Sequence, residues 1–215
     1  MNYKEGILLV DKPSGPTSHD IVDFIRRKYR VKKVGHAGTL DPMACGLLII
    51  LLGSFTKKSI QFSNYDKEYE ARLLLGVSTD TADKEGKIVE TKPLEEYEKG
   101  IREIENTLAT FRGHIRQVPP MFSAKKIKGK KLYELARKGI VAKREPKEIY
   151  IEELKLLSLS LPEVSFYIKC SKGTYIRQLA HDIGERIGCG AHLVHLKRTK
   201  IGPYSNENAV PFNEL

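Results

Sequence analysis

The sequence contains no tryptophan, and only three of its 215 residues are cysteines. Those cysteines, at positions 45, 170 and 189, are odd in number and show no paired C-x-x-C spacing. Such usage excludes a disulfide scaffold and is typical of a chain that folds in a reducing compartment. Long hydrophobic runs are also missing, because the longest, at residues 47–52, is far too short for a membrane span. We therefore expect a soluble cytoplasmic protein without a signal peptide and without a membrane partner.

Recognisable cofactor and metal motifs are missing as well. The chain has neither a dinucleotide-binding fingerprint nor a P-loop. Residues 78–83 carry several carboxyl and hydroxyl groups, but they do not fit an EF-hand, and we expect a solvated connecting loop at residues 76–92. Cys189, His192 and His195 lack a fourth ligand, and positions 192 and 195 of an extended segment point to opposite faces. We expect no metal and no cofactor.

Acidic residues are the minority: the sequence has 37 Lys and Arg against 27 Asp and Glu, a formal charge of +10. Residues 112–147 account for that whole excess, with twelve basic and two acidic side chains. Two aromatic residues, Phe122 and Tyr133, are interleaved with the lysines Lys125, Lys126, Lys128, Lys130 and Lys131. Cations neutralise phosphates and rings stack on bases, so this segment favours a nucleic-acid partner over a merely solubilising loop.

The loop at residues 34–48 presents a single carboxylate, Asp41, after glycines at 35 and 38. The proline at position 42 removes one backbone donor and disfavours helical geometry at Asp41, so we expect an extended turn there. The apolar run that follows predicts a buried strand, which would support the loop rigidly. A structural turn, in which Asp41 caps a backbone amide, is the alternative that local pattern leaves open.

Apolar periodicity predicts the neighbouring elements. We expect strands at residues 6–10, 69–75 and 164–170, and an amphipathic helix that begins near Pro93. A capping box formed by Thr17 and Asp20 predicts a helix through residue 29, whose basic side is either a solvated face or an RNA contact. A further helix is expected after Gly173, capped by Thr174. Arg177 in its first turn needs a carboxylate partner, because an unpaired charge cannot face the core.

Several motifs, in order along the chain, resemble those of the TruB family of tRNA pseudouridine synthases. They are Lys-Pro-x-Gly-x-Thr-Ser at 12–18, Gly-His-x-Gly-Thr-Leu-Asp-Pro at 35–42, Lys-x-Tyr-x-Ala at 67–71, Val-Pro-Pro-x-Phe-Ser-Ala-x-Lys at 118–126, Lys-Gly-Thr-Tyr-Ile-Arg at 172–177 and Gly-Cys-Gly-Ala-His-Leu-x-x-Leu-x-Arg at 188–198. The resemblance implies an α+β fold, with a mixed, mostly antiparallel central sheet flanked by helices. It also implies a cofactor-free isomerase that converts uridine 55 of the tRNA T loop to pseudouridine.

The same resemblance implies roles for single residues. Asp41 corresponds to the catalytic aspartate, and Arg177 to the arginine that pairs with it. Four residues would bind the substrate: Tyr69 stacks on the target base, Tyr175 packs against it, Leu196 lies beside the pocket and His36 holds the RNA loop in its opened shape. The five lysines at 125–131 would contact the RNA backbone.

We expect residues 1–215 to form one catalytic domain, in which segment 112–147 clamps the RNA, without a complete C-terminal PUA domain. The expected partner is the T arm of tRNA, bound by a monomer that needs no other protein. Two alternatives stay open, namely a guide-RNA-dependent relative and a tRNA-binding or tRNA-folding protein without enzymatic activity. Asp41 and Arg177 favour an enzyme over the second, and the basic segment favours a stand-alone enzyme over the first.

Overall fold

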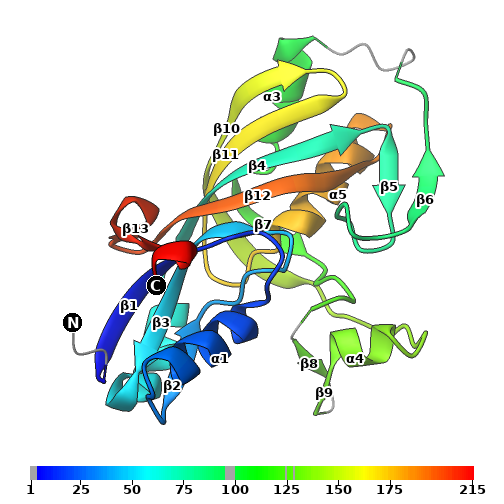
Figure 1. Ribbon diagram of the computed structural model, residues 1–215. Coiled ribbons are helices and arrows are strands. Elements are labelled where there is room, and N and C mark those ends of the chain that lie inside the picture. Colours follow the sequence, from blue (N-terminus) through cyan, green and yellow to red (C-terminus); the bar gives the residue numbers. More distant parts are fainter. Residues whose placement is uncertain (1–3, 95–99, 124, 128) are drawn as a thin grey trace. The chain divides into compact units, whose positions relative to one another are not determined.

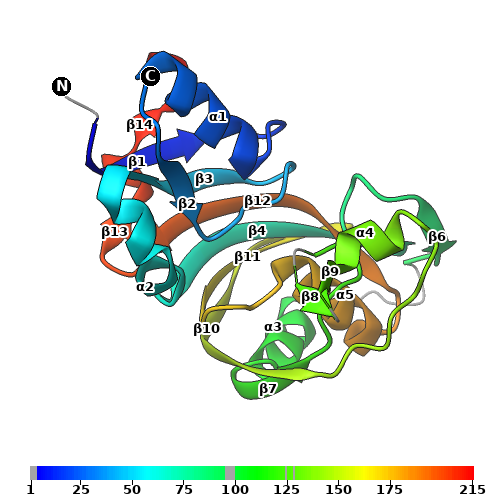
Figure 2. The same cartoon turned by 90° about the horizontal axis from the view of Figure 1, so that it is seen from below.

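The computed structural model describes residues 4–94, 100–123, 125–127 and 129–215. Its chain divides into two compact units. Unit 1 comprises Met1–Glu70 and His195–Leu215, and unit 2 comprises Ala71–Val194. Strands β4 (Lys67–Leu75) and β12 (Ala191–Ile201) contribute residues to both units. Each unit is a sheet covered by helices (Figures 1 and 2), as expected for an α+β protein.

Unit 1 is built around strand β3, whose neighbours are β1, β2 and β12. Strands β1 and β2 run antiparallel to β3, whereas β12 pairs with it in parallel, so this sheet is mixed. The outer strand β14 pairs with β1, and β13 pairs with β12. The other elements of unit 1 are β1 (Gly6–Lys12), α1 (Ser18–Lys28), β2 (Val34–Ala37), β3 (Cys45–Leu52), η1 (Gly53–Lys58), α2 (Ser59–Ser63), β13 (Tyr204–Ser205), η3 (Asn206–Asn208), β14 (Val210–Pro211) and η4 (Phe212–Glu214).

Strand β3 is buried on both faces, which confirms the buried strand predicted from its apolar run. Leu48, Ile50 and Leu52 belong to a cluster that includes the apolar side of α1. The alternate residues Leu47 and Ile49 belong to a second cluster, with Phe62 of α2 and Ile201 of β12. A continuous apolar run is what a strand covered on both sides requires.

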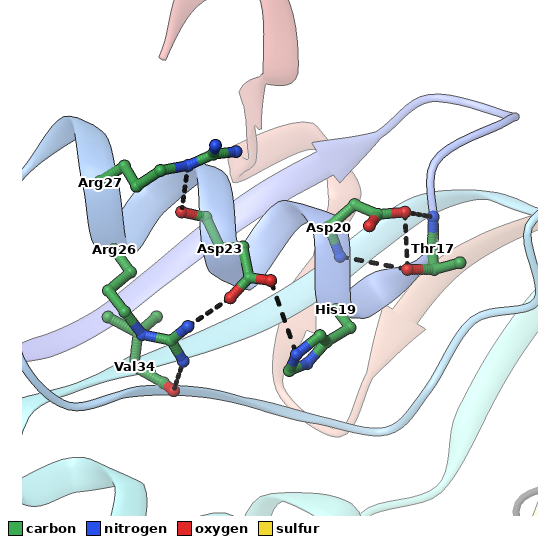
Figure 3. A network of polar contacts seen from close by, with 7 residues as sticks. All are labelled: Thr17, His19, Asp20, Asp23, Arg26, Arg27 and Val34. Atoms are coloured by element: carbon green, nitrogen blue, oxygen red, sulfur yellow. Dashed lines mark hydrogen bonds and ion pairs between the residues drawn. The ribbon is translucent and has the colours of Figure 1, made fainter.

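Helix α1 begins at the predicted capping box, in which Thr17 and Asp20 exchange hydrogen bonds (Figure 3). The bonds that Thr17 donates lower the pKa of Asp20. Further along the helix, Asp23 accepts hydrogen bonds from Arg26, and His19 lies 3.6 Å from its carboxylate. Arg26 Nη2 also donates to the carbonyl oxygen of Val34 at 3.4 Å, which ties α1 to β2. Strand β2 then leads directly into the loop that carries Asp41.

Unit 2 is a curved sheet that packs against helices α3 and α5 (Figure 2). Its strands follow the order β12, β4, β11, β10, β7, and β10 is antiparallel to both of its neighbours. The remaining elements are β5 (Val77–Thr79), β6 (Ile88–Thr91), α3 (Ile101–Ala109), β7 (Gly113–Gln117), β8 (Lys126–Ile127), β9 (Lys130–Lys131), α4 (Leu132–Ala136), β10 (Lys147–Ser160), β11 (Glu163–Cys170) and α5 (Ile176–Ile187). The strand pairings confirm the expected mixed, mostly antiparallel architecture.

Two strands of unit 2 were predicted from the alternation of apolar residues, and the structure contains both. Alternate residues of β11 are buried from Val164 to Cys170, as predicted, and so are those of β4. The predicted helix start near Pro93 was wrong, because Pro93 and Leu94 are not helical and α3 begins at Ile101 with Gly100 as its N-cap residue; residues 95–99 lie outside the described part of the chain. Another local prediction was also wrong: Thr174 does not cap α5. Its hydroxyl donates to the Ser171 carbonyl at 2.9 Å, and Tyr175 is the N-cap residue.

Candidate active site

Asp41 lies in the loop between β2 and β3, outside any helix, as predicted. It is half-buried, whereas its neighbours Leu40, Met43 and Ala44 are buried. The Ala44 amide donates to the Asp41 carbonyl at 3.1 Å and closes the turn. The backbone is thus anchored on apolar side chains around a half-buried carboxylate.

Several of the hydrogen-bond donors that hold this loop belong to residues 12–18. Lys12 is fully buried, and its ammonium donates to the carbonyl oxygens of Ala44 at 2.7 Å and Pro42 at 3.3 Å. The Ser18 hydroxyl donates to the Leu40 oxygen at 3.1 Å and accepts from the Leu40 amide at 2.9 Å. Two more bonds come from this segment: Ser14 Oγ to the Met43 oxygen (2.9 Å) and the Gly15 amide to the Pro42 oxygen (2.8 Å).

Arg198, on β12, holds the beginning of the loop and the strand that follows it. Its side chain is buried, with 1% exposed. Nη2 donates to the Gly38 oxygen at 2.9 Å, Nη1 to the Thr39 oxygen at 3.5 Å and Nε to the Leu47 oxygen at 2.8 Å. Arg198, the donors at residues 12–18 and the Ala44 amide together give every carbonyl oxygen from residue 38 to residue 44 a hydrogen bond.

The predicted site residues of unit 1 gather around Arg198. Burial lowers the pKa of its guanidinium, while Tyr69 and the charge of Asp41 act in the opposite direction. Leu196 lies two residues earlier on β12 and therefore on the same face of the strand. His36, on β2, has its pKa lowered, first by burial and then by the charge of Arg198. The Nδ1 atom of His36 is buried and has no hydrogen-bond partner among the residues that the structure describes.

In unit 2, Arg177 is buried beside a carboxylate, as predicted from its position in the first turn of the helix. Its Nη1 lies 3.2 Å from Asp83 Oδ2 and also donates to the Thr81 carbonyl at 3.2 Å. Its Nη2 donates to the carbonyl oxygen of Phe122, at the start of the basic segment, at 2.8 Å. Asp83 is therefore one carboxylate partner of Arg177 within unit 2. The pairing of Arg177 with Asp41 stays a prediction.

Asp83 corrects the prediction that residues 76–92 form a solvated connecting loop. Its side chain is 4% exposed, and Ser78 and Thr79 are buried too. Asp83 Oδ1 accepts from Thr81 Oγ1 at 2.6 Å and from the Glu85 amide at 3.0 Å. A polar composition suggested a solvated segment, but Asp83 is paired with Arg177, and the Thr79 hydroxyl donates to the Asp83 carbonyl at 2.7 Å, which makes the burial of these groups tolerable.

Tyr175 and the basic segment are linked through Gln117, the last residue of β7. The side-chain amide of the buried Gln117 donates to the Tyr175 carbonyl at 3.0 Å and accepts from the Tyr175 backbone amide at 2.9 Å.

Beyond Gln117, the predicted short helix is present as α4. Lys125 is half-buried and Lys130 is exposed. The other three lysines are placed as follows: the backbones of Lys126 and Lys131 lie in β8 and β9, and Lys128 lies outside the described residues.

Neither a metal centre nor a membrane helix is found in the parts of the chain that the structure describes. No three His, Cys, Asp or Glu side chains within those ranges could hold a metal ion together. His192 Nδ1 lies 2.8 Å from the Val77 carbonyl oxygen, and Cys189 Sγ donates to the Gly190 oxygen. No helix in these ranges has the length and apolar character that crossing a bilayer requires.

Sequence reasoning assigned no role to five residues that hold the site: Lys12, Ser18, Asp83, Gln117 and Arg198. A signal existed for two of them. Lys12 continues the inward alternation of Leu8 and Val10 in β1, and Arg198 that of Leu196 in β12. A cation at the inward position of a strand is costly unless it is hydrogen-bonded, so such a position marks a buried polar contact.

Two family models together match most of the chain. The "TruB family pseudouridylate synthase (N terminal domain)" matches residues 26–176, and the "tRNA pseudouridylate synthase B C-terminal domain" matches residues 177–215. The chain is similar to proteins named tRNA pseudouridine synthase B. It is 49% identical to that of Protochlamydia amoebophila, over 100% of this chain and 80% of the relative, and 49% identical to that of Burkholderia pseudomallei, over 98% and 69%.

Solved structures support the same fold. The chain is similar to a protein in "Crystal Structure of a Cbf5-Nop10-Gar1 Complex", with a TM-score of 0.78, 29% identity and coverage of 100% of this chain and 54% of that one. A second neighbour, in "Structure of H/ACA RNP bound to a substrate RNA containing 2'-deoxyuridine", has a TM-score of 0.74 and 26% identity, with coverage of 100% and 53%. The chain thus spans about half the length of these solved neighbours.

Replacing Asp83 tests the buried ion pair. We expect Asp83→Asn to lower the free energy of unfolding by about 3 kcal/mol, because the amide leaves the charge of Arg177 uncompensated in a buried site. Urea unfolding of the full chain measures the change. Asp80→Asn is the matched control, since Asp80 is exposed and an asparagine still accepts from the Lys87 amide. A loss for Asp83→Asn no larger than that for Asp80→Asn would contradict the expected cost.

The lowered pKa of His36 predicts a pH dependence of stability. Below the ordinary histidine pKa of 6.5, the unfolded chain binds a proton at His36 that the folded chain binds more weakly. The free energy of unfolding therefore decreases as pH falls from about 7.5 to about 5.5, and His36→Asn removes this contribution. We expect a flatter pH profile of urea unfolding for His36→Asn than for the parent. The exposed His195 provides a control, because His195→Asn should keep the parental slope. Equal slopes for the parent and His36→Asn would show that His36 does not act in this way.

Proposed function

Since this chain belongs to the TruB family of pseudouridylate synthases, we propose that it converts the uridine at position 55 of the tRNA T loop to pseudouridine, with Asp41 as the catalytic residue. The reaction breaks the N-glycosidic bond, turns the base and rejoins it to the same ribose through carbon. It involves no net redox change and no phosphate donor. It needs a carboxylate that adds to the base or sugar, or abstracts a sugar proton, and a pocket that retains the detached base.

The observation that carries this proposal is the fixed loop around Asp41. Each of its carbonyl oxygens from residue 38 to residue 44 accepts a hydrogen bond. Catalytic groups act efficiently when their supporting backbone is immobile, because small displacements are costly to the rate. A turn that only capped a backbone amide would not need two buried cations, Lys12 and Arg198, to hold its carbonyls.

A second requirement is to hold a uridine outside its stack. Enzymes that act on a base extrude it and grip it between aromatic or apolar side chains. We assign this role to Tyr69 and Leu196 in unit 1 and to Tyr175 in unit 2. His36 would support the opened RNA loop. Burial favours the neutral form of its imidazole, which suits hydrogen bonding and stacking rather than binding of a phosphate.

The charge distribution supports an RNA substrate. Segment 112–147 carries the formal excess of +10, and its lysines would neutralise backbone phosphates of the T arm. We propose that the protein acts as a monomer without a guide RNA or protein partner, in the cytoplasm, where tRNA is modified. Identity of 49% to proteins named tRNA pseudouridine synthase B, against 29% to the neighbour in the Cbf5 complex, favours the stand-alone reading.

Product formation on tRNA is the direct test. An unmodified tRNA transcript is incubated with the protein without metal or nucleotide, and pseudouridine at the T-loop uridine is quantified. We expect product with the parent and a rate at least ~10³-fold lower with Asp41→Asn, which lacks the ionised oxygen that the chemistry needs. Asp66→Asn is the matched control, because Asp66 is an exposed aspartate of the same unit. A parent protein that binds tRNA but makes no product would indicate a guide-dependent or binding-only protein and contradict the proposal.

Salt dependence tests the basic segment separately from the chemistry. We expect Lys130→Ala to weaken tRNA binding and to reduce the slope of log affinity against log salt by about 1, because one fewer counterion is released. Lys155→Ala is the control: Lys155 is exposed, lies outside the segment and pairs with Glu153. Binding is measured by filter retention over a range of salt concentrations. A slope for Lys130→Ala equal to that of the parent would exclude a phosphate contact at this lysine.

A further inference from the structure

The proposed activity by itself assigns no role to Arg198. We infer that Arg198 is a positioning residue for pseudouridine formation, whose guanidinium holds the start of the Asp41 loop and strand β3 in one fixed arrangement. This inference rests on the proposed function, since it concerns how the Asp41 carboxylate is aimed at its substrate. In this role Arg198 acts through the Asp41 loop and not on the reacting atoms themselves.

The geometry begins with the backbone of Arg198. Strand β12 pairs in parallel with β3, and Arg198 lies opposite Gly46. A Cβ at Gly46 would stand 2.3 Å from the Arg198 carbonyl oxygen, and Gly46 has a φ of +96°, so only glycine permits this close approach. Gly46 follows the Asp41 loop directly. The base of the Arg198 side chain is therefore locked to the strand that carries the end of the loop.

From this fixed base the guanidinium reaches both ends of the loop. Nε bonds to Leu47 beyond the loop, whereas the two terminal nitrogens bond to Gly38 and Thr39 at its start. Gly38 has a φ of +82°, which turns the chain there at no steric cost. Bridging these carbonyls requires several donors at fixed angles to one another. A planar guanidinium provides them, whereas the ammonium of lysine is a single point charge on a flexible stem.

The contact with Tyr69 couples the loop to the pocket wall. Tyr69 lies on β4 and is 7% exposed. Its side chain raises the pKa of the same guanidinium that holds Gly38 and Thr39, two to three residues before Asp41, so the ring lies beside Arg198. A displacement of the guanidinium would therefore move the carboxylate and the ring together. Misplacement by about 1 Å at a catalytic group is enough to slow a reaction by about 10²-fold.

Replacing Arg198 by lysine separates positioning from charge. We expect Arg198→Lys to lower the single-turnover rate constant at saturating tRNA by about 10²-fold, while the dissociation constant for tRNA stays within about threefold of the parent. Lys200→Met is the matched control, because Lys200 lies on the same strand, is half-exposed and pairs with Glu68. It should keep the parental rate. A merely structural arginine would instead change stability and tRNA binding and leave the rate constant of the folded fraction unaltered.

A double-mutant cycle with Tyr69→Phe tests the coupling. Tyr69→Phe removes the hydroxyl alone, and we expect it to slow the reaction by about 10-fold with tRNA binding retained. Because both changes loosen one arrangement, the double variant should lose less than the product of the two single losses. If Arg198→Lys does not unfold cooperatively, Tyr69→Phe still decides, since a parental rate for it would overturn the inference.

The outcomes separate this inference from the proposed function. An active parent matched within threefold by Arg198→Lys, or single losses that multiply in the double variant, would overturn the role of Arg198 alone. A parent protein that makes no pseudouridine would contradict the proposed function and this inference with it.

Discussion

The Asp41 loop depends on hydrogen bonds from buried cationic side chains to backbone carbonyls. A loop that contains glycines and a proline has little regular structure of its own, and its carbonyls find no partners in a helix or a strand. Here Lys12 and Arg198, together with serines 14 and 18, supply those partners. Asp41 is thereby held in a defined position without belonging to any regular element.

Burying two cations would be unfavourable if their charges met only apolar neighbours. The dipoles of several carbonyl groups offset that cost, since each cation donates to more than one oxygen. The arrangement also sets the sign of the local field. Positive charge next to the loop disfavours a second cation and adds to the effect of burial, which is the main cause of the lowered pKa of His36.

In unit 2, hydrogen bonds from buried polar side chains to backbone groups likewise hold the start of α5. Arg177 binds the carbonyls of Thr81 and Phe122 in addition to Asp83, and Gln117 binds both backbone groups of Tyr175. Three segments far apart in sequence, near residues 81, 120 and 176, are thus joined by polar side chains. The basic segment, at Phe122, is thereby tied to the helix that begins next to Tyr175 and carries Arg177.

Patterns that depend on neighbouring residues were readable from the sequence. The capping box of Thr17, the buried β3 strand and the alternation in β11 follow from local geometry and burial, and the structure contains all three. The position of Asp41 outside any helix followed from the proline after it. Motif order along the chain then indicated the family, because each motif is a short contiguous stretch.

Contacts between distant residues were decided only by the tertiary structure. Strand alternation marks Arg198 and Lys12 as inward positions but does not give their partners: the contact of Arg198 with Gly38 spans 160 residues, and Lys12 reaches Pro42 across 30. The burial of Asp83 could not be read from a polar segment either, since its partner Arg177 lies on a different element. The sequence by itself determined the elements, the motif residues and the charge of the basic segment, because these depend on composition and short-range periodicity. Which buried polar groups face one another depends on how strands and helices pack, and only the folded chain specifies that.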